Sequence, residues 1–219
     1  MANVALGALA LDCLVGVAAA VIDLREVAII NRVINDPESV SDAEIDTSDT
    51  IYAASGMVET AVFVVAGVAF LLWLFRVRAN AELLAPQGHR HPKFWLILGW
   101  GVPIIAFWFP KQIVDDIWGA SQRGGADRPS RSGLITAWWA AWLISSLVSR
   151  VVGSLLRWAD DLEGMVTAAQ FDLVSIALWF VTAALAAGVI LRITSAQELR
   201  RFAPSASPPA DRGYSSASS

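Results

Sequence analysis

Cysteine, histidine and recognisable catalytic motifs are all scarce in this 219-residue sequence. The single cysteine, Cys13, excludes an intramolecular disulfide framework and a zinc cage built from cysteines. His89 and His91 form an H-x-H pair, a weak signal for a metal when no further ligands are in view. No nucleophile–base pair, zinc motif or phosphate-binding loop is visible. The sequence therefore predicts a protein that is not an enzyme and uses no cofactor.

Charged residues are also few. They make up 16% of the chain, the net charge is −4, and 56% of residues are hydrophobic, so the mean hydropathy is +0.54. A soluble domain of this size needs far less apolar sequence. The basic residues lie in short clusters beside apolar runs rather than on one basic face, so we expect no nucleic-acid partner. The composition predicts an all-α integral membrane protein whose solvent is the lipid bilayer.

Four apolar runs are long enough to cross the hydrocarbon core as helices. They cover residues 4–30, 51–75, 134–152 and 166–191. We expect the first to be a retained span rather than a signal peptide, because no Lys or Arg precedes Arg25 and the apolar stretch is longer than an ordinary signal sequence. Asp12, Glu59 and Asp172 fall inside the runs. Such groups are costly in lipid and should face other helices.

The connections between the runs differ in charge. Residues 35–50 carry six carboxylates and no basic residue, which indicates a solvated acidic loop. After the second run, Arg76, Arg78, Arg90 and Lys93 outnumber Glu82. The positive-inside rule places this basic loop, and with it both termini, in the cytoplasm. We therefore expect a multi-pass membrane protein, with residues 202–219 as a disordered cytoplasmic tail.

The central segment, residues 94–120, is the least regular part of the sequence. Residues 95–109 would form about 22 Å of helix, short of the roughly 30 Å hydrocarbon core. Pro103 and Pro110 each remove a backbone donor from it. After Pro110 the pattern favours an amphipathic helix in which Lys111 pairs with Asp115 four residues later.

The loop that follows carries Arg123, Arg128 and Arg131, so it too is predicted to be cytoplasmic. A segment that begins and ends on one side has not crossed the membrane. We therefore expect a re-entrant or interfacial segment, enclosed by the other helices. The alternative is a kinked fifth span, which would place the arginine loop outside.

The spans suggest an internal repeat. Residues 1–78 and 133–200 each read as a helical hairpin with an acidic outer turn, and they flank the central segment within a single membrane domain, residues 1–201. Binding sites often lie at the interface of such repeats. Trp138, Trp139 and Trp142 lie close together in the third span, where they either mark the membrane interface or form an aromatic box for a cation.

The central motif also supports a family resemblance. The run W-x-x-P-x-x-x-x-W-x-P-K-Q-I-V-D-D-I-W at residues 100–118, together with FLLWLFRVRANAELLAP, ITAWWAAWLISS and LRITSAQELRR, resembles the bacterial membrane-protein family called Domain of Unknown Function 4328. The resemblance covers residues 62–201. Members tend to have an asparagine before the aromatic-Pro turn, where this chain has Ala106. The resemblance implies a multi-span protein of the bacterial plasma membrane and assigns no activity.

Two classes of function fit the sequence. The first is a non-enzymatic module that binds or regulates a membrane or cytoplasmic protein partner. The second is a small-solute or ion pathway at the repeat interface, because ionisable groups inside a membrane are functional candidates; it would be lined by Asp12, Glu59, Lys111, Asp115, Asp116 and Asp172. The candidate functional cluster consists of Arg76, Arg78, Asn80, Trp100, Pro103, Trp108, Pro110, Lys111, Asp115, Trp118, Trp138 and Trp142.

Overall fold

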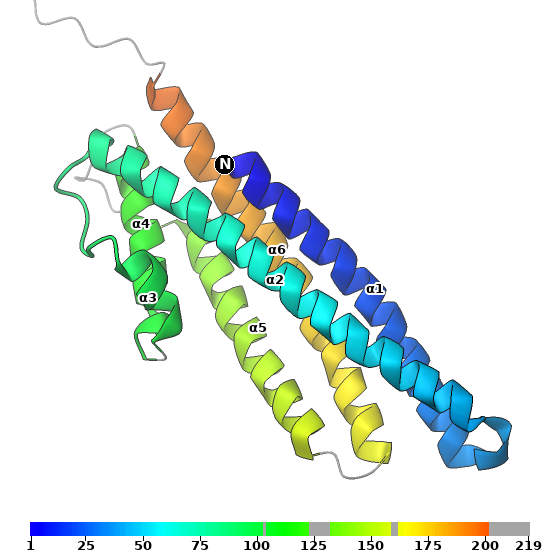
Figure 1. Cartoon of the computed structure of the whole chain (residues 1–219). Coiled ribbons are helices and arrows are strands. Elements are labelled where there is room, and N and C mark those ends of the chain that lie inside the picture. Colours follow the sequence, from blue (N-terminus) through cyan, green and yellow to red (C-terminus); the bar gives the residue numbers. More distant parts are fainter. Residues whose placement is uncertain (103, 123–131, 159–161, 202–219) are drawn as a thin grey trace, which may run out of the picture.

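The computed structural model describes residues 1–102, 104–122, 132–158 and 162–201. All regular elements in this part of the chain are helices (Figure 1). The α-helices are α1 (Ala2–Asn35), α2 (Asp42–Leu84), α3 (Trp95–Gly101), α4 (Phe109–Ser121), α5 (Gly133–Trp158) and α6 (Leu162–Arg201). Short 3-10 helices, η1 (Pro37–Ser39) and η2 (Ile105–Phe107), lie before α2 and between α3 and α4. The predicted tail, residues 202–219, and Pro103 lie outside the described residues.

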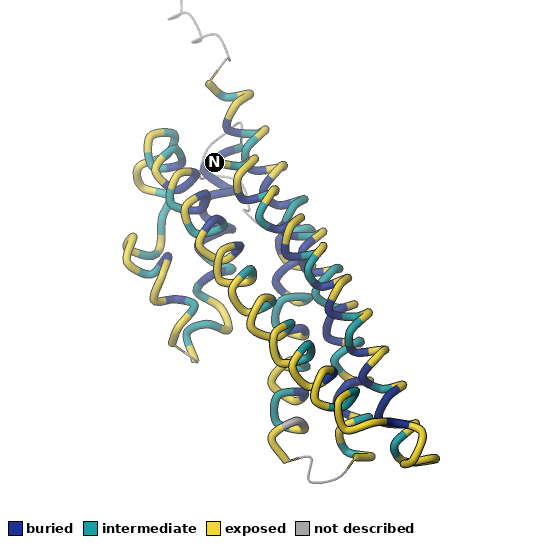
Figure 2. The backbone as a smooth tube through the Cα atoms, turned by 45° about the vertical axis from the view of Figure 1, so that its right-hand side comes forward, coloured by how far each residue is buried: buried dark blue, intermediate teal, exposed yellow. Residues whose placement is uncertain are grey.

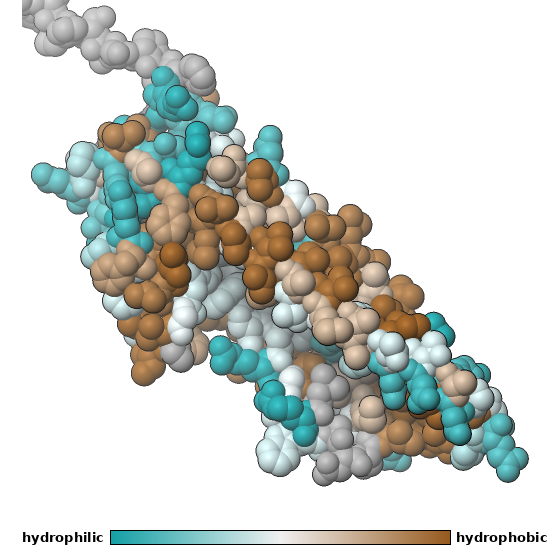
Figure 3. Space-filling model, in the orientation of Figure 1, coloured by the Kyte–Doolittle hydropathy of each residue, from teal (hydrophilic) through white to brown (hydrophobic). Residues whose placement is uncertain are grey.

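Four of these helices, α1, α2, α5 and α6, are long and apolar enough to cross a membrane, as the sequence predicts. No more than 33% of the most apolar window of any of them is buried inside the chain. Exposed apolar side chains therefore cover the outside of the bundle, and apolar residues form its middle between more hydrophilic ends (Figures 2 and 3). In water this surface would be an aggregation liability, but lipid solvates it. The chain is an all-α membrane protein with four candidate spans.

The long helices run back and forth between two ends of the bundle (Figure 1). We call the end where α2 finishes and α5 begins the basic end, and the end that holds η1 the acidic end. Helix α6 packs against both α1 and α5, and α1 also packs against α2. Each predicted hairpin, α1 with α2 and α5 with α6, is thus joined to the other chiefly through α6.

Helix α2 is longer than the predicted second span at both ends. The prediction of a loop through residue 50 is wrong, because the helix begins at Asp42: the Ser41 hydroxyl accepts a hydrogen bond from the Glu44 backbone N–H at 3.3 Å. Acidic residues in that first turn, Asp42 and Glu44, favour a helix N-terminus. At the other end the helix continues past Arg76 and stops before Pro86, since proline disfavours helical backbone in the residue that precedes it.

Helices α3 and α4 form a shorter hairpin at the basic end (Figure 1). At 1.5 Å per residue, their 7 and 13 residues are each too short to cross a bilayer alone. They approach closely at Gly99, where an added Cβ would lie 3.6 Å from the Phe109 Cβ. Helix α4 packs against α2, α5 and α6, and its residues from Ile113 to Ser121 are all buried.

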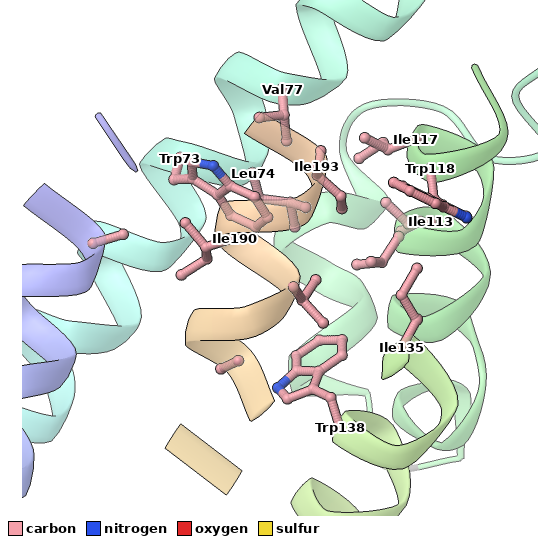
Figure 4. Packing of buried hydrophobic residues seen from close by; sticks show 14 of the residues in the cluster. Trp73, Leu74, Val77, Ile113, Ile117, Trp118, Ile135, Trp138, Ile190 and Ile193 are labelled. Atoms are coloured by element: carbon pink, nitrogen blue, oxygen red, sulfur yellow. The ribbon is translucent and has the colours of Figure 1, made fainter. Parts of the chain in front are cut away.

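The core at the basic end is where these helices meet. Side chains from α2, α4, α5 and α6 converge there (Figure 4). They include Trp73, Leu74, Val77, Ile113, Ile117, Ile135, Trp138, Ile190 and Ile193. The central segment is therefore built into the bundle rather than attached to its outside.

Candidate functional site

The predicted cluster divides into a polar network at the basic end and an aromatic group deeper in the bundle. Arg78 on α2 belongs to the network and is 3% exposed. Its Nε donates to Glu82 at 3.1 Å, and its Nη2 donates to the His91 carbonyl at 2.9 Å. Lys93 contacts the other Glu82 oxygen at 2.7 Å. Helix α2 thus binds the segment that leads into α3.

Helix α4 contributes two carboxylates to the same network. The Lys111 ammonium lies 2.6 Å from Asp115, as the i,i+4 spacing predicts, and Asp115 is 5% exposed. The neighbouring Asp116 is also buried and accepts from the Arg90 backbone N–H at 3.0 Å and from its guanidinium at 2.8 Å. This contact raises the pKa of Arg90. Asp115 and Asp116 therefore have separate partners, Lys111 and Arg90.

Gln197 on α6 connects three helices and is absent from the predicted cluster. Its amide nitrogen donates to the Val77 carbonyl at 2.9 Å and to the Ser121 hydroxyl at 3.1 Å. Its amide oxygen accepts from Asn80, a predicted site residue, at 3.0 Å. Gln197 is only 4% exposed. It follows that the role of Asn80 depends on a residue 117 positions away, which no local pattern could indicate.

The aromatic group brings Trp100 on α3 against α5. The Trp100 ring centroid lies 6.3 Å from that of Trp138 and 5.4 Å from that of Trp142. Trp139 stacks on Trp142 at 4.8 Å, and its Nε1 donates to the Phe107 carbonyl at 3.1 Å. The predicted residues Trp100, Trp138 and Trp142 are thus brought together, and Trp139 anchors the turn of the α3–α4 hairpin to α5.

The remaining predicted residues are scattered. Arg76 and Trp108 are exposed. Pro110 is buried at the start of α4, a position that suits proline because the backbone N–H there has no helical partner. Trp118 is buried, and the Arg192 guanidinium lies 4.7 Å from its ring centroid. These four side chains do not share one site.

The two histidines do not point to a shared metal. The His91 Nε2 lies 2.7 Å from the Gln112 side-chain oxygen. Burial lowers the pKa of His89, and the nearby Arg78 charge lowers it further. Among the described residues, no group of three or more His, Cys, Asp or Glu side chains could hold a metal ion.

Two neighbouring pockets lie between the hairpins. One has a volume of about 250 Å³ and is lined almost entirely by apolar groups of α2, α3, α5 and α6, including Phe70, Trp100, Trp138 and Trp142. The other has a volume of about 400 Å³ and contains three carboxylate side chains from three different helices: Asp12 of α1, Glu59 of α2 and Asp172 of α6. Phe63 and Trp179 line both.

The acidic pocket brings together three of the six residues that are predicted to line a solute or ion pathway. Asp12, Glu59 and Asp172, which the sequence suggests as intramembrane candidates, lie together, whereas Lys111, Asp115 and Asp116 do not line this pocket. The Trp179 indole N–H donates to Asp12. Sequence reasoning overlooks Trp179 because a tryptophan within an apolar run looks like ordinary lipid-facing or core sequence.

The comparisons with known proteins decide the family. A family model described as a domain of unknown function, DUF4328, matches residues 36–195. The chain belongs to the DUF4328 family. No curated protein and no solved structure matches the chain. The DUF4328 match starts earlier than the predicted resemblance and includes the whole of α2, but it leaves out all of α1 and the last six residues of α6.

The DUF4328 region therefore contains Glu59, Asp172 and the whole α3–α4 hairpin, whereas Asp12 lies on the helix before it. The family assigns no chemistry to any of them.

One prediction concerns the link between Arg90 and Asp116. Replacing Asp116 by Asn removes a charge-assisted hydrogen bond from a buried acceptor, so we expect a loss of about 2 kcal/mol in the free energy of unfolding. Unfolding of the purified protein in detergent, followed by tryptophan fluorescence, measures this change. Arg76→Gln, at an exposed position, is the control and should change little. Equal free energies of unfolding for Asp116→Asn and Arg76→Gln would show that the contact between Arg90 and Asp116 does not stabilise the fold.

Proposed function

We propose that this DUF4328 protein is a non-enzymatic membrane protein that binds a small solute in the acidic pocket between its two hairpins. The observation that carries the proposal is the convergence of Asp12, Glu59 and Asp172, from three helices, on one pocket. All three belong to helices that are candidate membrane spans. Carboxylates in such segments are costly and mark solute or ion sites by default.

We further propose that the basic end faces the cytoplasm and that the α3–α4 hairpin enters and leaves the bilayer there. The support is the exposed apolar surface of this hairpin. Ile97 is 54% exposed, Ile104 is 70% exposed and Phe107 is 58% exposed. Lipid would cover these side chains, and the basic residues around them suit the cytoplasmic side by the positive-inside rule.

The polar network at the basic end is less suited to bind a solute. Arg90, Lys93 and Lys111 each have a carboxylate partner within the chain. Groups that are already paired would have to break an internal bond before they could bind a ligand. Binding of a protein partner at this end stays a prediction from the sequence, and the acidic pocket is the better supported site.

The proposal can be tested with dicyclohexylcarbodiimide, an apolar reagent that enters membranes and modifies protonated carboxyl groups. A pocket that admits a solute should also admit this reagent. We expect covalent modification of Glu59 or Asp172, located by mass spectrometry of peptides from protein in lipid nanodiscs. Glu59→Gln and Asp172→Asn should each lose the modification at their own position.

Asp116 provides the control. It is 7% exposed on α4, paired with Arg90 at the basic end, and does not line the pocket. We expect Asp116 to stay unmodified under the same conditions. Modification of Asp116 to the same extent as Glu59 and Asp172, or of none of the three, would contradict a solute-accessible pocket.

A further inference from the structure

The acidic pocket and the apolar pocket are adjacent, with Phe63 and Trp179 as a common wall. The two rings contact each other edge to face, with centroids 5.4 Å apart. One side of this pair presents carboxylates, and the other presents the indoles of α3 and α5. A charged surface and an apolar surface thus lie next to each other, on either side of this ring pair.

The acidic side is short of positive partners. None of the described residues that line it is basic. Asp12 accepts a hydrogen bond from Trp179, but an indole N–H carries no full charge. A cluster of carboxylates in a low-dielectric site is stabilised when a cation lies among them.

Ser175 gives a second and independent sign of a missing ligand. It lines the acidic pocket and is 7% exposed, and its hydroxyl oxygen has no hydrogen-bond partner among the described residues. A buried polar group without a partner costs free energy, so such groups are nearly always paired. A ligand in the pocket would supply the partner that the chain does not.

The apolar pocket indicates that the ligand has an apolar body as well as a charge. Its lining includes the rings of Phe70, Trp100, Trp138 and Trp142, with almost no polar surface. Aromatic faces attract cations and also bind apolar groups well. A small hydrated metal ion would gain nothing from this surface, whereas an organic cation with an aromatic or alkyl body would fill it.

We propose that the ligand is a lipophilic organic cation, with its charge among Asp12, Glu59 and Asp172 and its apolar body against the indoles of the neighbouring pocket. This inference rests on the proposed function, since it names the class of solute for the same site. We expect each chain to bind one monovalent, amphiphilic cation.

The probe is radiolabelled 4-phenylbutylammonium, whose N–H groups can donate to carboxylates and to a hydroxyl oxygen. Its binding is measured by equilibrium dialysis against the full chain in nanodiscs, with empty nanodiscs subtracted. We expect saturable binding of one cation per chain. Glu59→Gln and Asp172→Asn should each weaken the affinity at least tenfold, and Trp142→Leu should weaken it through the apolar side. Glu198→Gln, which removes an exposed carboxylate from the same helix as Asp172 but outside the pocket, should leave the affinity unchanged.

4-Phenylbutanesulfonate is the matched ligand control, because it has the same apolar body and the opposite charge. We expect no saturable, chain-dependent binding of this anion. The unfolding temperature of each variant is first compared with that of the unmodified chain. If Glu59→Gln or Asp172→Asn fails to fold, the remaining one of the two tests the role of the carboxylates.

The possible outcomes separate the two proposals. Equal binding of the anion, or cation binding that neither carboxylate variant weakens, would overturn the cation assignment. If the carbodiimide modifies Glu59 or Asp172 but 4-phenylbutylammonium does not bind, the solute class is wrong and the pocket remains a solute site. If neither reagent reaches the pocket, the proposed function fails as well.

Discussion

Replacement of Gln197 by Leu should lower the free energy of unfolding by about 3 kcal/mol, because it leaves several buried polar groups without their partner. The amide of Gln197 bonds to Asn80 and Val77 on α2 and to Ser121 on α4. Leucine has a similar volume, so packing is retained and the loss reports hydrogen bonds. For a chain of this size the unfolding temperature should fall by about 10 °C.

The control for this change is Glu198→Leu, one position along the same helix and exposed. It alters helix propensity and charge near the α6 C-terminus without touching the network. We expect its unfolding temperature to stay within about 2 °C of the unmodified chain, since surface substitutions usually change little. If Gln197→Leu were equally harmless, α6 would not be holding α2 and α4 together through this side chain.

Replacement of Trp139 by Ala should be the most damaging change in the aromatic group. Trp139 is 4% exposed, stacks on Trp142 and donates to the Phe107 carbonyl. Removing a buried indole costs about 3–5 kcal/mol in packing, and here it also frees the turn between α3 and α4. Hydrogen exchange should therefore speed up over residues 95–109 more than elsewhere.

Trp139→Phe separates the two contributions, because it retains an aromatic ring and loses the N–H donor. We expect it to cost about 1 kcal/mol, the typical value of one hydrogen bond. Trp108→Ala is the exposed control on the same hairpin turn. Faster exchange over residues 95–109 in Trp108→Ala, with none in Trp139→Ala, would mean that the turn is not anchored by Trp139.

The sequence predicts the four spans well, since each is a long apolar run and lipid contact does not depend on which helices are neighbours. It predicts their ends poorly. Residues 42–50 look like a solvated loop because they are acidic, yet the Ser41 cap and the acidic first turn allow α2 to begin there. Polar composition indicates solvent contact, which an exposed helix end provides as well as a loop does.

Within the candidate site, the sequence predicts the contact between neighbouring positions but not the contacts between distant ones. The pairing of Lys111 with Asp115 follows from i,i+4 spacing and is confirmed. The contact between Arg90 and Asp116 spans 26 positions, and that between Asn80 and Gln197 spans 117, so neither leaves a local pattern. Asp12, Glu59 and Asp172 could be recognised as unusual in apolar runs, but only the packing of α1, α2 and α6 places them in one pocket.

In the proposed architecture, the α3–α4 hairpin begins and ends on one side of the membrane. Single cysteines at Ser41, Gln87 and Gln122, in a Cys13→Ala background, can be labelled with a membrane-impermeant maleimide in intact cells and in inverted vesicles. We predict that Ser41→Cys reacts in intact cells and that Gln87→Cys and Gln122→Cys react only in inverted vesicles. Reaction of Gln87→Cys and Gln122→Cys from opposite sides would contradict the account, because the central segment would then cross the membrane.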